Sequence, residues 1–138
     1  MKEVNAYLNF DGDCRKAMHF YQQSLGGELQ ISPFPDQTGK PSSDPAARVM
    51  HSQLERNGQA ILMASDTPQN GSLRLGNNVS VAIQCDSVAE IDRLFTALSQ
   101  SGQVIMPLFD APWGARFGMF TDQFGIQWLL NCFLSKPN

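Results

Sequence analysis

Apolar and polar residues alternate along several short stretches of this chain, a period of two that is typical of β-strands with one buried face. In residues 3–10, for example, Val4, Leu8 and Phe10 fall on one side and Tyr7 on the other. The same pattern, with its β-branched and aromatic residues, predicts eight strands, over 3–10, 28–32, 48–56, 59–65, 78–84, 103–108, 116–121 and 126–133.

Two pairs of these strands are expected to form hairpins. Asn57-Gly58 is a strong two-residue turn signal between the third and fourth strands. Residues 122–125 separate the last two strands. There Gly125 can adopt a positive φ, and Asp122 can accept a hydrogen bond from its own backbone at the entrance of the turn.

Two other stretches have a helical period and predict helices over 14–25 and 88–100. Asp13 and Asp86-Ser87 are expected to cap their first turns, and glycines follow their last turns. The predicted buried stripes are Cys14, Ala17, Met18, Tyr21 and Leu25 in the first helix and Val88, Ile91, Leu94, Phe95 and Leu98 in the second.

The order strand, helix, three strands therefore occurs twice, which indicates an internal repeat. An offset of 75 places residues 11–27 over 86–102, and an offset of 67 pairs Leu62 with Leu129. The Pro-rich loop over 33–47 can supply the eight residues by which the offsets differ. We predict an α+β protein with one domain over 1–138, made of a first βαβββ unit (3–66), a polar linker (67–77) and a second unit (78–133).

Composition excludes several classes of partner. The chain has 138 residues, a net charge of −3 and a pI of about 5.2, so no basic surface for nucleic acid or an anionic membrane is expected. The N-terminus turns polar too early for a signal peptide, and no apolar run has the length of a membrane span. Three cysteines without a CxxC motif are typical of buried thiols in a reducing compartment. We therefore expect a soluble, cytoplasmic protein.

The opening NAYLNFDGDCRKAMHFYQQSLGGEL and the close WGARFGMFTDQFGIQWLLN carry a resemblance to a known family. With the duplicated unit, they resemble the vicinal-oxygen-chelate superfamily of glyoxalase I, extradiol dioxygenases and fosfomycin and bleomycin resistance proteins, and within it the PhnB-like branch. The resemblance implies a curled, partly open barrel of mixed β-sheets, with helices outside and a cavity inside. Some members are labelled as demethylubiquinone methyltransferase domains, but this chain lacks the Gly-rich turn that a nucleotide-type methyl donor usually needs.

The resemblance also implies where a metal would bind, on the first and last strand of each unit. Those positions are Asn5, Leu62, Ser80 and Leu129 in this chain. Leucine donates no electron pair, and neutral amide and hydroxyl oxygens are poor ligands for zinc or iron. We therefore expect neither the inherited metal nor a cofactor, and we assign no catalytic residue.

The leading hypothesis is a cavity that holds a small organic ligand through hydrogen bonds and aromatic stacking. His51 remains open between a half-exposed strand residue and a hydrogen-bonding group or base. The ligand-binding residues that we predict are Asn5, Tyr7, His51, Ser80, Trp113, Phe117, Gln127 and Asn131, with Trp113 and Phe117 near the mouth.

Two alternative functions remain: a metal-dependent glyoxalase- or dioxygenase-like enzyme whose metal site lies elsewhere, and a structural or interaction module with a filled core. In each case we expect a homodimer, because exposed strand edges are normally covered.

Overall fold

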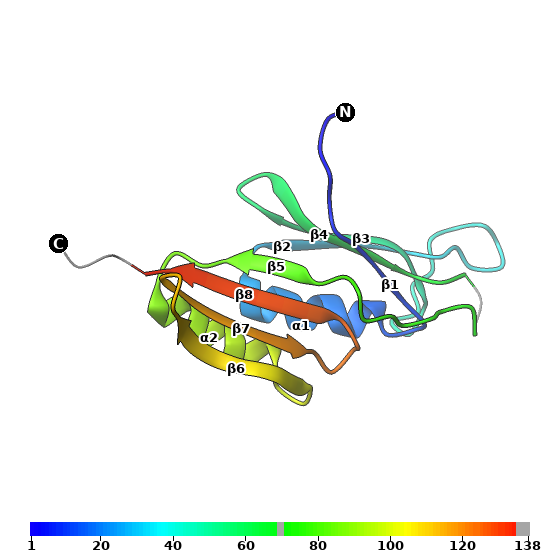
Figure 1. The fold of residues 1–138 in the computed structure, drawn as a ribbon. Coiled ribbons are helices and arrows are strands. Elements are labelled where there is room, and N and C mark those ends of the chain that lie inside the picture. The colour runs from blue at the N-terminus through cyan, green and yellow to red at the C-terminus, as the bar shows by residue number, and fades with distance from the viewer. Residues whose placement is uncertain (69–70, 135–138) are drawn as a thin grey trace. The chain divides into compact units, whose positions relative to one another are not determined.

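The computed structural model describes residues 1–68 and 71–134, which form an α+β protein (Figure 1). The chain divides into two compact units, Met1–Arg74 and Leu75–Asn138. Each unit contains a strand, a helix and three further strands, so the predicted repeat of element order is confirmed. No helix in the described ranges is long and apolar enough to cross a membrane.

In the first unit, the four strands form one mixed sheet in the order β1-β4-β3-β2. β1 runs parallel to β4, whereas β4 to β3 and β3 to β2 are antiparallel. The helix α1 packs against β2, β3 and β4. The elements are β1 (Tyr7–Phe10), α1 (Cys14–Leu25), β2 (Glu28–Pro33), β3 (Val49–Arg56) and β4 (Gln59–Asp66).

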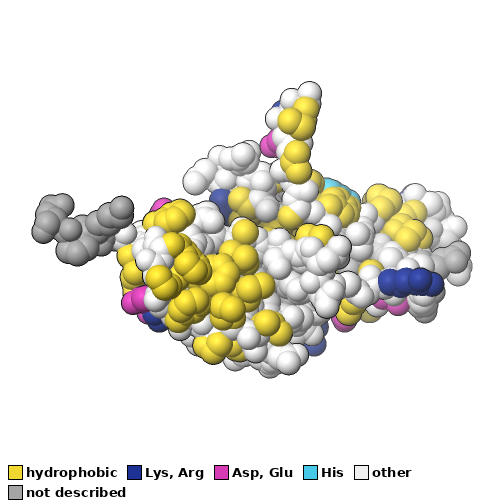
Figure 2. Space-filling model, in the orientation of Figure 1, with side chains coloured by type: hydrophobic (Ala, Val, Ile, Leu, Met, Phe, Trp, Pro, Cys, Tyr) yellow, Lys and Arg dark blue, Asp and Glu magenta, His cyan; other side chains and the backbone are white. Residues whose placement is uncertain are grey.

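The second unit has the same topology, with the sheet order β5-β8-β7-β6 and α2 packed against β8 and β7. Figure 2 shows hydrophobic side chains gathered on the surface over the strands of this sheet. Exposed apolar residues in and beside its strands include Phe109 and Trp113. The elements are β5 (Val81–Gln84), α2 (Val88–Leu98), β6 (Gln103–Ala111), β7 (Ala115–Thr121) and β8 (Gln127–Phe133).

Each unit has its own core between the helix and one face of the sheet. In the first unit, Leu54 and Ala64 of the sheet and Met18 and Tyr21 of α1 are all buried, and α1 packs against the strands of both sheet residues. In the second unit the largest buried side chain is Trp128, which stacks on Phe120. The interpretation of Trp128 as a core residue is therefore confirmed.

One glycine is needed in the second core because the helix packs closely over it. A Cβ at Gly118 would lie 2.6 Å from Cε2 of Phe95 and 2.9 Å from Cδ2 of Leu108. Real Cβ atoms do not approach other atoms so closely. Gly118 therefore allows Phe95 of α2 to lie directly on β7.

The predicted turns and helix starts are confirmed, with one exception. The Asn57-Gly58 turn has positive φ at both residues, as a two-residue hairpin requires. Ser87 caps α2 by accepting a hydrogen bond from the Glu90 amide. Asp13 occupies the N-cap position of α1, but its side chain makes no capping bond.

The first strand of each unit is shorter than the alternation predicted. β1 begins at Tyr7 and β5 at Val81. Val4 and Val79 precede these strands and are 85% and 76% exposed, so the predicted strands over 3–10 and 78–84 begin too early and Val4 is not on a buried face. Alternation continues in sequence beyond the residues that pair with a neighbouring strand, and it cannot mark where pairing stops.

The offset between the last strands of the two units is one residue smaller than the sequence comparison indicated. Tyr7 pairs with Met63 in the first unit, and its counterpart Ala82 pairs with Leu129 in the second. Leu129 therefore corresponds to Met63. Leu62 instead faces α1 and is 2% exposed. A bulge between Leu54 and Glu55 supplies the extra residue, and a slip of one residue exchanges the two faces of a strand.

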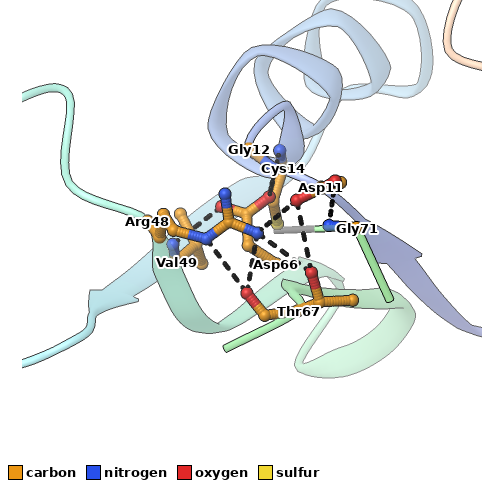
Figure 3. Close-up of polar contacts among 8 residues, drawn as sticks. All are labelled: Asp11, Gly12, Cys14, Arg48, Val49, Asp66, Thr67 and Gly71. Atoms are coloured by element: carbon orange, nitrogen blue, oxygen red, sulfur yellow. Dashed lines mark hydrogen bonds and ion pairs between the residues drawn. The ribbon is translucent and has the colours of Figure 1, made fainter. Parts of the chain in front are cut away.

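A buried carboxylate joins three segments of the first unit (Figure 3). Asp66, at the end of β4, is 2% exposed. Its Oδ1 accepts hydrogen bonds from the amides of Gly12 at 2.7 Å and Cys14 at 3.0 Å, and its Oδ2 accepts one from Val49 at 2.8 Å. Asp66 thus fixes the end of β4 to the start of α1 and the start of β3.

An ion pair lies beside this carboxylate. Nη2 of Arg48 lies 2.6 Å from Oδ1 of Asp11 and donates to the Thr67 carbonyl at 2.8 Å. Asp11 also accepts a hydrogen bond from the Gly71 amide. The hydrogen bond from Arg48, followed by that from Gly71, lowers the pKa of Asp11. Because the residues of this group bond to one another and to the backbone, we interpret it as structural.

We predict that Asp66→Asn destabilises the protein by about 2–4 kcal/mol, since hydrogen bonds to a charged group contribute about 1.5–3 kcal/mol each. An amide NH₂ would also face a backbone N–H that it cannot satisfy. Urea unfolding followed by circular dichroism measures the change. Asp36→Asn is the matched control, because Asp36 also accepts backbone hydrogen bonds but lies in an exposed turn. Equal effects of the two substitutions would contradict the structural role of Asp66.

Candidate functional site

Each sheet has a second face, turned away from its own helix, which we call its open face. Side chains alternate between the two faces along a strand, and directly paired residues share a face. The buried residues of the core define the helix side. The open face of the first sheet therefore carries Tyr7, His51, Gln53 and Met63, and that of the second carries Gln84, Phe117, Gln127, Leu129 and Asn131.

A tyrosine and a histidine meet on the open face of the first sheet. The Tyr7 hydroxyl lies 3.1 Å from Nδ1 of His51, and the ring centroids are 5.8 Å apart. Tyr7 comes from β1 and His51 from β3, so the pair reaches across β4. A neutral imidazole has one donor nitrogen and one acceptor nitrogen. If Nδ1 accepts from the Tyr7 hydroxyl, Nε2 can donate a hydrogen bond; if Nδ1 donates, Nε2 can accept one. The pair can donate or accept a hydrogen bond and can pass on a proton.

Three aromatic rings form a cluster on the second unit, which we call the aromatic cluster: Phe109, Trp113 and Phe117. The ring centroids lie 6.1–6.3 Å apart and all three contacts are edge-to-face. Phe109 and Phe117 pair directly between β6 and β7, and Trp113 lies in the turn that joins these strands. Trp113 remains 63% exposed, as its position in a loop indicated.

Two carboxamides lie next to this cluster, and we call them the amide pair: Gln84 and Asn131. Nδ2 of Asn131 donates to Oε1 of Gln84 at 2.9 Å. Asn131 is directly paired with Phe117 between β8 and β7, so the amide pair and the aromatic cluster are neighbours. Asn131 is 7% exposed, whereas Gln84 is exposed.

The remaining predicted residues are more scattered. Gln127 lies on the open face of the second sheet, but its Nε2 donates to the Gly76 carbonyl. Ser80 precedes β5 and is half-buried, and Asn5 lies exposed before β1. Phe109 was not predicted as a site residue, because the predicted strand ends at 108, three residues too early. The strand continues to Ala111, and pairing with Phe117 identifies Phe109.

The donor set at the inherited metal positions does not fit zinc or iron. With the corrected register these positions hold Asn5, Met63, Ser80 and Leu129. A thioether is a soft ligand that suits copper(I), and the other three groups are neutral or apolar. In the described ranges, no three His, Cys, Asp or Glu side chains lie together as a metal site would need.

The cysteines are buried and free, as predicted. Sγ of Cys14 lies 3.5 Å from Oγ of Ser52, beneath the sheet. Burial raises the pKa of Cys14 to about 11, and burial followed by the nearby Glu90 raises that of Cys85 to about 11. Because the thiolate is the reactive form, neither residue is suited to act as a nucleophile.

Comparisons with known proteins agree on one family. The profile of the Glyoxalase/Bleomycin resistance protein/Dioxygenase superfamily matches residues 4–130. The crystal structure of protein PA1353 from Pseudomonas aeruginosa is 40% identical, covers 98% of this chain and 100% of its own, and superposes with a TM-score of 0.83.

Two further relatives show which branch of that superfamily this chain resembles. The PhnB protein from Bacillus cereus is 28% identical, with a TM-score of 0.78 and coverage of 95% of this chain and 99% of its own. Protein YjdN from Escherichia coli (strain K12) is 26% identical, and the match covers 97% of both chains. The resemblance to the PhnB-like branch that the sequence indicated is confirmed.

We predict that the native protein reacts very slowly with Ellman's reagent at pH 8, because all three thiols are buried and because deprotonation of Cys14 and Cys85 is suppressed. In guanidinium chloride, three thiols per chain should react at once. The absorbance of the released chromophore measures both rates. A rapidly reacting thiol in the native protein would reveal an accessible cysteine and contradict this account.

Proposed function

Because this chain belongs to the Glyoxalase/Bleomycin resistance protein/Dioxygenase superfamily, we propose that it binds a small organic molecule on the open faces of its sheets. The binding requires no metal at the inherited positions. The observation that carries the proposal is the hydrogen-bonded pair of polar side chains on each open face, Tyr7 with His51 and Gln84 with Asn131. A surface that served only for packing would favour apolar side chains at these positions.

The chemistry of the two faces suits a neutral or weakly polar ligand. Imidazole, phenol and carboxamide groups donate and accept hydrogen bonds, while the aromatic cluster offers ring faces and edges. Ligand sites in proteins commonly combine apolar walls with a few polar groups that fix orientation. We propose that the open faces line the cavity of the curled, partly open barrel that the family resemblance implies, with the helices outside. The full set of proposed ligand-binding residues remains Asn5, Tyr7, His51, Ser80, Trp113, Phe117, Gln127 and Asn131.

An enzyme is the second candidate, and the hydrogen bond between Tyr7 and His51 favours it. A histidine oriented by a hydroxyl partner is a common arrangement for general acid–base catalysis. The metal-dependent form of this alternative would need a ligand set other than Asn5, Met63, Ser80 and Leu129.

We also propose that the protein acts in the cytoplasm as a homodimer. The edges of both sheets and the exposed apolar side chains of the second unit are the features that a partner copy would cover. Sedimentation that shows only monomer at micromolar concentration would count against the dimer.

We expect at least one compound from a panel of aliphatic, aromatic, anionic and cationic metabolites to raise the melting temperature. A ligand at about 100 times its Kd stabilises the folded state by about 2.7 kcal/mol. His51→Gln or Asn131→Leu should remove most of the shift. His19→Gln is the matched control, because His19 is exposed on α1. A shift that neither open-face substitution changes would contradict binding at these faces, and a panel without any shift would favour the structural module.

We predict that the purified protein contains far less than one zinc, nickel or iron ion per chain and that chelators leave its melting temperature unchanged. The physical reason is the donor set, in which the four inherited positions offer no carboxylate, imidazole or thiolate. Elemental analysis by mass spectrometry measures the content. A stoichiometric metal that is lost in His51→Ala would make His51 a ligand and favour the enzyme.

A further inference from the structure

We propose that the open face of the second sheet selects an uncharged, planar aromatic molecule that carries a hydrogen-bond donor next to an acceptor on one edge. The ring would stack on the aromatic cluster, and the edge would bond to the amide pair. This inference rests on the proposed function and narrows it to a class of ligand. It assigns roles to Phe109 and Gln84 in addition to Trp113, Phe117 and Asn131.

The aromatic cluster is arranged to receive a ring. Its three contacts are all edge-to-face, with interplanar angles of 72–86°. Because edge-to-face contacts use the edge of one ring and the face of another, three rings arranged in this way leave ring faces uncovered. The indole of Trp113, at 63% exposure, offers the largest such surface. An aromatic ligand that pairs with one of these rings gains about 0.5–1.5 kcal/mol in addition to the gain from burying its apolar area.

The amide pair supplies the complementary edge. One hydrogen bond joins Asn131 to Gln84, and within the described ranges Oδ1 of Asn131 and Nε2 of Gln84 form no other hydrogen bond. If both amides are turned over, the roles exchange, and one donor and one acceptor again remain open side by side. A lactam or primary amide edge presents the matching acceptor and donor.

The position of the pair beside the cluster sets the geometry. Asn131 is directly opposite Phe117, and such residues have Cβ atoms about 4.5–5.5 Å apart. Gln84 lies one strand further, because it pairs with Asn131 between β5 and β8. A bicyclic ring over Phe117 can therefore reach the amides with one edge, while Phe109 of β6 bounds it on the other side.

The electrostatics of this face favour an uncharged ligand. Among the described residues of the four strands, those paired on the open face carry no formal charge. Arg116 and Asp110 lie on the opposite face, where Arg116 also bonds to Asp92 of α2 at 2.8 Å. An ion would lose its hydration here without gaining a partner. The open-face residues are Ala82, Gln84, Gln103, Met106, Phe109, Ala111, Ala115, Phe117, Met119, Thr121, Gln127, Leu129, Asn131 and Phe133.

The test uses isoquinolin-1-one, a neutral bicyclic lactam, with the full-length protein. Trp128 is buried, so quenching of indole fluorescence reports mainly on Trp113. We expect saturable quenching with a Kd below about 1 mM, as a fragment of this size can achieve. Methylation of the lactam nitrogen should weaken binding about 3–10-fold, the effect of one hydrogen bond. Isoquinoline-1-carboxylate should bind still more weakly, because the face offers it no positive charge.

Substitutions test whether the amide pair recognises the lactam edge or whether the surface binds any apolar molecule. Gln84→Leu should weaken lactam binding about 3–10-fold, since it removes a donor while retaining side-chain size. In the double variant Gln84→Leu and Asn131→Leu, the lactam and its N-methyl derivative should bind equally. Gln123→Leu is the control, because this exposed glutamine lies in the turn between β7 and β8. For the Trp113→Ala variant, calorimetry measures the affinity for the lactam. We expect this affinity to fall at least about fivefold.

Three results would overturn the inference. The first is a lactam Kd above about 1 mM, and the second is equal affinity for the lactam, its methyl derivative and the carboxylate. The third is a dimer that Trp113→Ala converts to monomer while the lactam binds to neither form, since a second copy would then occupy the face. If charged or aliphatic compounds nevertheless give melting shifts that depend on His51, the inference fails and the proposed function stands.

Discussion

The strict alternation of side chains along a β-strand constrains everything else in this protein. Each unit has a single helix, and that helix can cover only one face of its four-stranded sheet. Leu54, Phe120 and Trp128 therefore meet a helix, whereas residues one position away meet none from their own unit. Polar and aromatic side chains collect on the open face because it does not pack against the helix of its own unit. The candidate site thus follows from the way each core is built.

The register between paired strands is as important as the alternation along each strand, and hydrogen bonds to buried carboxylates fix this register. Asp66 bonds to three backbone amides from the start of α1 and the start of β3. In the second unit, Asp122 accepts hydrogen bonds from the amides of Phe124 and Ile126 and from the Trp128 indole, in the turn between β7 and β8. Each carboxylate fixes the end of a strand, and a slip by one residue would leave its donors unsatisfied. These contacts keep the Tyr7–His51 and Gln84–Asn131 pairs in position.

Much of the fold could be predicted from periodicity and turn chemistry. The helix over 14–25 has the predicted bounds, and the turn at Asn57-Gly58 lies where it was predicted. A 3.6-residue period and an Asn-Gly turn are both recognisable in a sequence. The bulge after Leu54, in the pairing of β3 with β4, has no comparable sequence signal. The comparison of the two units therefore placed Leu62 where Met63 lies.

The candidate site was predictable only in part. Phe117 and Asn131 pair directly between β7 and β8, and Trp113 contacts Phe117 from the turn just before β7, so these neighbours are local in sequence. The contact between Tyr7 and His51 joins residues 44 positions apart and depends on the order of strands in the sheet. A pattern along the chain assigns each of them to a face but cannot show that they meet.

The central claim is that ligand binds to the open faces and not beneath the helices. Intermolecular nuclear Overhauser effects between protein side chains and the compound with the largest melting shift test it most directly. The account predicts contacts to open-face residues such as His51, Phe117 and Leu129. It predicts none to Leu54, Phe120 or Leu130, which lie on the helix side of the same strands. Contacts to the helix-side residues, or to the surface of α1 or α2, would contradict it.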